Sequence, residues 1–135
     1  MKRFRKVVVP VMLWAVLVVA CRSQSPHPIM VVEVVEQDAG KTIQVPIGRT
    51  IRVILDGNPT TGYAWEATSV DASILNQVGK PSFTSDSSAI GSGGKMTFNF
   101  QTIGSGETVL RLIYHRSFER DQPPLKTFEV TLVVK

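Results

Sequence analysis

The sequence predicts an all-β fold, an immunoglobulin-like antiparallel β-sandwich of about seven to eight strands. Polar and apolar residues alternate through most of the chain after residue 28, which is the period of a strand with one buried face. Clusters of Gly, Pro, Asp, Asn and Ser interrupt the alternation about every eight to twelve residues. Only residues 71–77 suit a helical turn, with Asp71 or Ser73 as its cap.

The first half of the domain carries four expected strands, at residues 29–35, 42–45, 50–55 and 63–67. These segments contain β-branched or aromatic residues, which favour strands. Asp56-Gly57 ends the third segment with turn chemistry. In the fourth segment, alternation places Tyr63 and Trp65 on one face and Ala64 on the other.

The second half carries three longer strands, at residues 96–100, 109–114 and 126–134. Apolar residues hold every second position of the first and the last of them, namely Met96, Phe98, Phe100, Phe128, Val130 and Leu132. Gly104-Ser105-Gly106 supplies the turn between the first two. Each of these segments therefore has one face suited to a buried core.

The first twenty residues have the features of an export signal. A basic start (Lys2, Arg3, Arg5 and Lys6) precedes an apolar run at residues 7–19, which is short for a membrane span. Ala20-Cys21 resembles the bacterial lipobox, in which the chain is cut before the cysteine and the thiol carries a lipid. An ordinary cleaved signal followed by a stray thiol is the alternative.

The expected organisation is a lipoprotein signal peptide at residues 1–20, a lipidated tether at 21–28 and a sandwich domain at 29–135. The lipid on Cys21 would anchor the exported chain in the bacterial cell envelope, in the periplasm. Arg22 follows Cys21 in place of the Asp that often retains lipoproteins at the inner membrane, which favours the outer membrane.

The basic charge of the chain belongs to the signal. Of fifteen Lys and Arg residues, four lie in the first twenty positions, so eleven basic residues remain against eleven acidic ones. A balanced domain lacks the basic stripe that nucleic-acid binding needs. Cys21 is the single cysteine, and the two histidines, His27 and His115, lie in the tether and at a strand end. We therefore expect no enzyme, metal site or cofactor.

A first loop, Asn58-Pro59-Thr60-Thr61-Gly62, carries more chemistry than a turn needs. Pro59 fixes its own φ and favours an extended Asn58, while Gly62 can adopt positive φ. Two β-branched hydroxyl residues, Thr60 and Thr61, lie between these stiff points. The pattern predicts a rigid, projecting knuckle, and a plain Asn-Pro turn is the alternative.

A second loop, at residues 84–95, contains Gly91, Ser92, Gly93 and Gly94. Three glycines in four residues make the backbone accessible to pair with another chain. A flexible hairpin loop remains an alternative. Phosphate binding is disfavoured, because neither a Lys-Ser/Thr pair nor a helix follows the glycines.

A third loop, at residues 115–124, contains Arg116, Ser117 and Phe118. A large aromatic residue in a charged loop either tucks under its own loop or contacts a partner, and the sequence leaves both open for Phe118. Arg116 is either a surface charge or a hydrogen-bonding anchor. In an immunoglobulin-type strand order the three loops share one end of the sandwich, where they form a wedge suited to a cleft.

The three loops resemble, in order and spacing, the three motifs of the chagasin family. The resemblance includes Asn58 to Trp65, Gly91 to Gly94, and Tyr114-His115-Arg116 before an aromatic residue. It implies a reversible, tight-binding inhibitor of papain-like, cathepsin L-type cysteine peptidases.

The resemblance also implies a role for each loop. Thr60 and Thr61 would lie beside the catalytic cysteine and histidine of the peptidase, and the glycine loop would pair with one rim of the cleft. Arg116 and its loop would pack on the other rim. The family usually has Arg-Pro-Trp where this chain has Arg116-Ser117-Phe118, which we expect to weaken binding by about 1 to 3 kcal/mol.

A monomer is expected, because an inhibitor of this kind must expose its tip. The alternative function is a non-inhibitory structural or adhesive envelope lipoprotein that uses an immunoglobulin-like module. That alternative predicts no effect on peptidases and tolerance of change at Thr60 and Thr61.

Overall fold

The computed structural model describes residues 30–119 and 121–135. The expected signal peptide (1–20), tether (21–28) and lipidated Cys21 lie outside these residues, as does the first residue of the expected domain. Within the described residues, no helix is long and apolar enough to cross a membrane.

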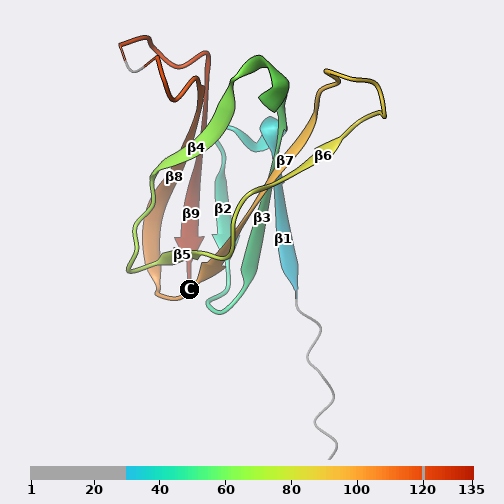
Figure 1. Ribbon diagram of the computed structural model, residues 1–135. Coiled ribbons are helices and arrows are strands. Elements are labelled where there is room, and N and C mark those ends of the chain that lie inside the picture. Colours follow the sequence, from blue (N-terminus) through green and yellow to red (C-terminus); the bar gives the residue numbers. More distant parts are fainter. Residues whose placement is uncertain (1–29, 120) are drawn as a thin grey trace, which may run out of the picture.

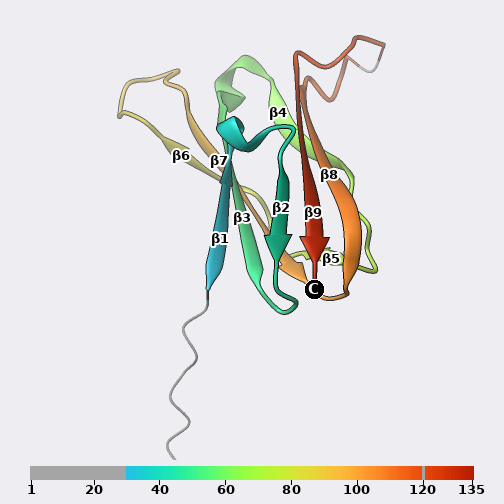
Figure 2. The ribbon, with the colours of Figure 1, turned by 180° about the vertical axis from the view of Figure 1, so that it is seen from behind.

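Two β-sheets pack face to face (Figures 1 and 2). The first sheet has the order β1 (Val31–Val35), β3 (Thr50–Gly57) and β7 (Gly94–Thr102), with β5 (Leu75–Gln77) and β6 (Ser82–Ser85) both paired to β7. The second sheet has the order β2 (Thr42–Val45), β9 (Lys126–Val134), β8 (Gly106–His115) and β4 (Ala64–Ser69). Two short 3₁₀ turns, η1 (Glu36–Asp38) and η2 (Pro59–Thr61), join strands of different sheets.

The prediction of an all-β, immunoglobulin-like sandwich is confirmed, with nine strands in the described part of the chain. The sheets are mixed rather than wholly antiparallel, because β1 pairs with β3 and β2 with β9 in parallel. The reason is topological. After β1, the chain crosses to the other sheet and runs back along β2. It then crosses again, so β3 lies beside β1 and runs in the same direction.

Residues 71–77 form a capped turn followed by a strand. The Asp71 carboxylate accepts a hydrogen bond from the backbone N–H of Ser73 at 2.9 Å, so Asp71 caps the turn as expected. The chain then enters β5 (Leu75–Gln77) instead of a helix. The expected helical turn is thus limited to one turn, in which the Leu75 N–H donates to the Asp71 carbonyl at 2.8 Å, and β5 pairs with β7 as an edge strand.

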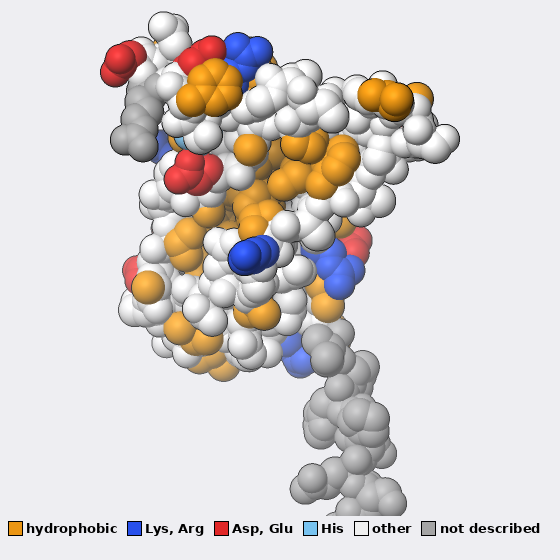
Figure 3. Space-filling view, in the orientation of Figure 1, with side chains coloured by type: hydrophobic (Ala, Val, Ile, Leu, Met, Phe, Trp, Pro, Cys, Tyr) orange, Lys and Arg blue, Asp and Glu red, His pale blue; other side chains and the backbone are white. Residues whose placement is uncertain are grey.

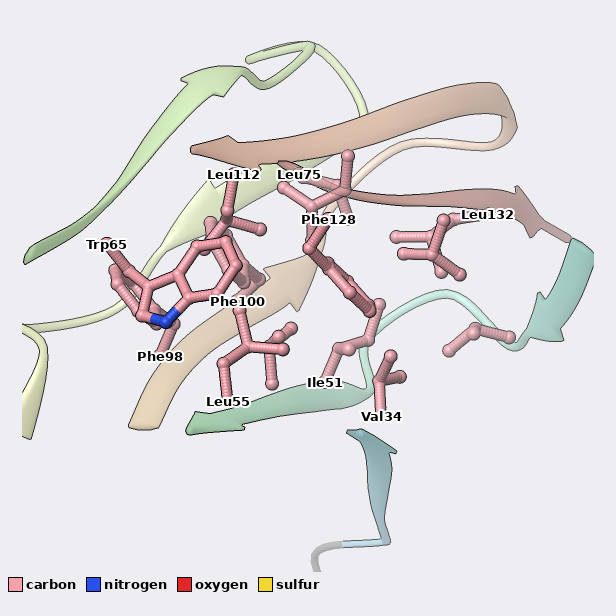
Figure 4. Close-up of a cluster of buried hydrophobic side chains, with 14 of the residues drawn as sticks. Val34, Ile51, Leu55, Trp65, Leu75, Phe98, Phe100, Leu112, Phe128 and Leu132 are labelled. Atoms are coloured by element: carbon pink, nitrogen blue, oxygen red, sulfur yellow. The ribbon is translucent and has the colours of Figure 1, made fainter. Parts of the chain in front are cut away.

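The core lies between the two sheets and consists of the alternating apolar residues (Figure 4). Its largest fully buried side chains are Phe98, Phe100, Phe128, Ile51, Leu55, Leu75, Leu110, Leu112 and Leu132. Each such side chain stabilises the fold by about 1.5–3 kcal/mol relative to its exposed state. Trp65 is buried and Tyr63 is partly buried, in line with their common face.

The strand registers bring three connections to one end of the sandwich. Gly57, at the end of β3, pairs with Gly94, at the start of β7, which also pairs with Ser85 at the end of β6. In the second sheet, Ala64 at the start of β4 pairs with His115 at the end of β8. The connections β3–β4, β6–β7 and β8–β9 therefore lie together (Figure 1).

Candidate functional site

Three loops at this end make up the candidate site, which we call the wedge. The first loop is residues 58–62, the second is 86–93, and the third is 116–119 with 121–125. The second loop is shorter than the sequence suggested, because Thr84 and Ser85 belong to β6, and Gly94 and Lys95 to β7.

The first loop is a closed 3₁₀ turn. The side chain of Asn58 accepts a hydrogen bond from the backbone N–H of Thr60 at 3.2 Å, which caps the turn. Gly62 ends it with φ of 80°, a left-handed conformation that favours glycine, and its N–H donates to the Pro59 carbonyl at 3.1 Å. The loop has the compact, projecting form that its Pro and Gly residues predict.

Thr60 and Thr61 lie exposed at the tip of the first loop. The hydroxyl of Thr60 donates to the Asn58 side-chain oxygen, and that of Thr61 donates to the Asn58 carbonyl at 2.6 Å. Both hydroxyls are therefore satisfied inside the loop. A tip of this kind can enter an enclosed cleft at a small desolvation cost.

The second loop is tied to the first by Asn58. The Asn58 side-chain N–H₂ donates to the Gly91 carbonyl oxygen at 3.0 Å. Within the second loop, the Asp86 N–H donates to the Gly93 carbonyl at 3.0 Å. The loop is thus a hydrogen-bonded hairpin end rather than a loose tract, and β7 follows it directly without a helix.

The third loop is tied to the first by Arg116. The Nε of Arg116 donates to the Thr61 carbonyl at 3.3 Å, and its Nη1 donates to Glu119 at 3.0 Å. The guanidinium also lies 4.5 Å from the centre of the Tyr63 ring. Of the two alternatives for Arg116, the structure shows the hydrogen-bonding anchor.

Phe118 does not tuck into the core, since 70% of its surface is exposed. Its ring lies against Gly62, where an added Cβ would be 3.4 Å from the ring edge. Ser117 is exposed beside it, and Ile90 is fully exposed at the tip of the second loop. Figure 3 shows apolar side chains on both flanks of this end of the molecule.

Beneath the wedge lie two aromatic residues, Trp65 and Tyr114, which belong to the sequence motifs but were not predicted to hold the loops. The hydroxyl of Tyr114 accepts a hydrogen bond from the Asn58 N–H at 2.8 Å, and the indole N–H of Trp65 donates to the Asp56 carbonyl at 2.9 Å. Alternation placed Trp65 on one face with Tyr63, and for Tyr114 it indicated only a strand with one buried face. It carries no information on which loop a buried polar tip will meet.

An ion pair between Lys95 and Asp56 lies at the base of the wedge. The Lys95 ammonium holds the pKa of Asp56 below its ordinary range through a hydrogen bond, and Asp56 in turn raises the pKa of Lys95. Both side chains are about half exposed, so solvent screens the pair. A hollow of about 360 Å³ opens here, lined by Asp56, Gly57, Asn58, Asp86, Gly93, Gly94, Lys95, Tyr114 and Lys126.

Comparison with known proteins places this geometry in a family. The sequence profile described as chagasin family peptidase inhibitor I42 matches residues 44–132. The chain belongs to the chagasin family. Family members are peptidase inhibitors rather than enzymes, and the matched region includes all three loops of the wedge. Chagasin of Trypanosoma cruzi is 29% identical over 97 residues, covering 69% of this chain and 88% of chagasin.

Two solved inhibitor structures share the fold of this chain. The crystal structure of the cysteine protease inhibitor EhICP2 from Entamoeba histolytica matches with a TM-score of 0.67 at 19% identity, covering 78% of this chain and 95% of that one. PbICP-C, solved in complex with falcipain-2, matches with a TM-score of 0.57 at 14% identity, covering 78% and 98%. At these identities the two structures show the shared fold.

Proposed function

We propose that the chain is a reversible, tight-binding inhibitor of papain-like, cathepsin L-type cysteine peptidases. Thr60 and Thr61 enter the active-site cleft beside the catalytic cysteine and histidine of the peptidase. The backbone of Gly91 to Gly94 lies along one rim, and the third loop packs on the other through Arg116 and Phe118. Such a complex buries about 1,600 Å² in total.

The observation that carries this proposal is the pair of hydrogen bonds that joins the loops. Asn58 reaches the Gly91 carbonyl, and Arg116 reaches the Thr61 carbonyl, so the three loops form one surface before any partner binds. A preorganised surface loses less conformational entropy on binding than three independent loops. Tight binding by short loops depends on this smaller loss of conformational entropy.

The backbone of the first loop also supports inhibition without cleavage. Residues Pro59–Thr61 form a 3₁₀ turn in which the Thr61 N–H donates to the Asn58 carbonyl at 3.2 Å. A chain that adds to a binding cleft as an extended strand offers its backbone groups for pairing. In this turn the N–H groups of Thr61 and Gly62 form hydrogen bonds within the loop. The loop therefore fills the cleft without presenting a peptide bond in an extended segment for attack.

We further propose that the inhibitor is exported as a monomer and anchored in the bacterial envelope, at the outer membrane, by a lipid on Cys21. The sequence of residues 1–22 supports the export and the lipid anchor, and the exposed tip of the first loop supports the monomer. Metabolic labelling with a fatty acid should mark the wild-type chain and leave a Cys21→Ser variant unlabelled. Equal labelling of both would remove the lipid anchor from the proposal.

The inhibitor proposal is tested by titrating papain with the chain from Arg22 to Lys135, which contains all the core residues of the described part of the chain. We expect stoichiometric loss of peptidase activity that is competitive with substrate. A gel of the protein recovered after long incubation should show it uncut. A folded chain that fails to inhibit papain and a cathepsin L-type enzyme at micromolar concentration would overturn the proposal and favour the adhesive lipoprotein.

A further inference from the structure

One buried side chain connects all three loops of the wedge. Tyr114 is the residue before His115, the last residue of β8, and it is 6% exposed. Its hydroxyl accepts a hydrogen bond from the Asn58 N–H at 2.8 Å and lies 3.4 Å from the Asn58 carbonyl oxygen. The hydroxyl therefore holds the backbone of Asn58 at the point where β3 becomes the first loop.

Asn58 passes this constraint to two loops. Its side-chain oxygen accepts from the Thr60 N–H at 3.2 Å, and its side-chain N–H₂ donates to the Gly91 carbonyl at 3.0 Å. The direction of an Asn side chain follows from the position of its own backbone. A shift of the Asn58 backbone would therefore move the tip of the first loop and release the second.

The ring of Tyr114 reaches the third loop by a second route. It stacks on Tyr63 with a centroid distance of 5.4 Å, and Tyr63 carries the guanidinium of Arg116 at 4.5 Å. Arg116 is two residues beyond Tyr114 in the chain and donates to the Thr61 carbonyl. The Tyr114 ring also lies 5.2 Å from that of Trp65, which is part of the core.

We propose that Tyr114 is the positioning residue of the wedge, which fixes the spacing of the three loops through its hydroxyl. This proposal rests on the inhibitory function proposed above. Without the hydroxyl, the loops spend part of their time in other arrangements. The apparent affinity equals the intrinsic affinity multiplied by the fraction of molecules that keep the competent arrangement. We therefore expect a Tyr114→Phe variant to raise the inhibition constant for papain about tenfold.

The matched control removes a buried hydroxyl at the other end of the sandwich. Thr102 is 1% exposed, and its hydroxyl binds the backbone of Pro46 and Arg49. Thr102→Val should lower the melting temperature by an amount comparable to Tyr114→Phe, while its inhibition constant stays within about twofold of wild type. If both variants weaken inhibition equally, Tyr114 contributes stability alone and the proposal is wrong.

A double-mutant cycle tests the route through Asn58. In an Asn58→Ala chain the side chain that ties the loops is absent, so adding Tyr114→Phe should raise the inhibition constant by less than about threefold further. A full additional tenfold rise would show that Tyr114 acts independently of Asn58 and would overturn the proposed route.

Amide hydrogen exchange of the uncomplexed chain separates this proposal from the inhibitory function. Tyr114→Phe should speed exchange about tenfold in the first loop, at the Thr61 and Gly62 amides, and leave β9 unchanged. This result would support the positioning role even if the wild-type chain inhibits no peptidase. Unchanged exchange in the first loop, or faster exchange spread evenly through the core, would overturn it.

Discussion

Thr61 is one of the two residues proposed to lie beside the catalytic cysteine and histidine of the peptidase. Its side chain is exposed, and its hydroxyl and carbonyl oxygen bind within the wedge, to Asn58 and Arg116. No part of the core rests on it. A change at this position can therefore abolish binding while the fold remains intact.

Replacing Thr61 with Arg should raise the inhibition constant at least 100-fold. A long charged side chain at the tip would have to lose its hydration to enter a closed cleft, and this desolvation is costly. The melting temperature should stay within about 2 °C of wild type, since exposed positions contribute little to stability. The control is Thr68→Arg, the same substitution at an exposed threonine of β4. Unfolding of the Thr61 variant would show instead that the first loop is structural.

Phe118 is one of two residues, with Ser117, at which the third loop departs from the Arg-Pro-Trp expected from the resemblance. The ring is 70% exposed beside Gly62, so a larger ring can be accommodated. Phe118→Trp should lower the inhibition constant by about three- to tenfold, because the indole adds contact area and an N–H donor. Titration of both chains against one peptidase checks this, and a weaker Trp variant would contradict the assigned contact.

At the scale of elements, the second loop depends on a close approach of β6 and β7. A Cβ atom added at Gly94 would overlap the carbonyl oxygen of Thr84, whereas one added at Gly93 would meet the Gly57 carbonyl at an ordinary 3.7 Å. Glycine at position 94 thus allows the two strands to meet, and the hairpin that carries the second loop follows from it.

Gly94→Ala should therefore destabilise the domain by about 2 kcal/mol or more, because the strands must separate to admit the methyl group. It should weaken inhibition as well, since the second loop would shift. Gly93→Ala, the neighbouring control, should change the free energy of unfolding by less than about 1 kcal/mol. Denaturant unfolding of both variants measures the difference in the free energy of unfolding. Equal stability would contradict the prediction, because it would show that β6 can move away from Gly94 at little energetic cost.

The elements that local sequence could predict are those with one buried face. Alternation located β3, β7, β8 and β9, because every second side chain enters the core. It missed β5 and β6, which are short edge strands and, in β6, exposed at every residue. The alternation also could not predict that β1 and β3 pair in parallel, because this pairing depends on β2 lying in the other sheet.

The same limit applies to the wedge. Pro59, Gly62 and the glycines of the second loop are visible in the sequence because they shape the backbone locally. The bonds from Asn58 to Gly91 and from Arg116 to Thr61 join residues 33 and 55 positions apart. No local pattern records such a contact, since it follows from the packing of the two sheets.

The whole molecule should lose stability in acid. Hydrogen bonds from the Lys41 side chain and the Val35 N–H lower the pKa of Asp38, and the Lys95 hydrogen bond lowers that of Asp56. A carboxylate whose pKa is lower in the folded state stabilises the fold above its unfolded pKa and loses that effect as pH falls through the folded value. The melting temperature should therefore drop below about pH 4.

Asp38→Asn provides the check, because the neutral side chain cannot lose a charge. At pH 6 the variant should melt at a lower temperature than wild type. As pH falls below the lowered pKa of Asp38, protonation removes the advantage of the wild-type carboxylate and the two melting curves should converge. A difference that persists unchanged into acid would mean that the Asp38 contacts stabilise the fold independently of charge.

Both described ends of the chain lie at the pole opposite the wedge. Val31 at the start of β1 pairs with Thr50 at the start of β3, and Val134 at the end of β9 pairs with Gly106 at the start of β8 (Figure 1). A tag, a carrier protein or a bead attached at either end would therefore leave the three loops facing solution. Such an immobilised chain could serve as an affinity matrix, which would retain the peptidases it recognises from a mixed extract and release them when the complex dissociates.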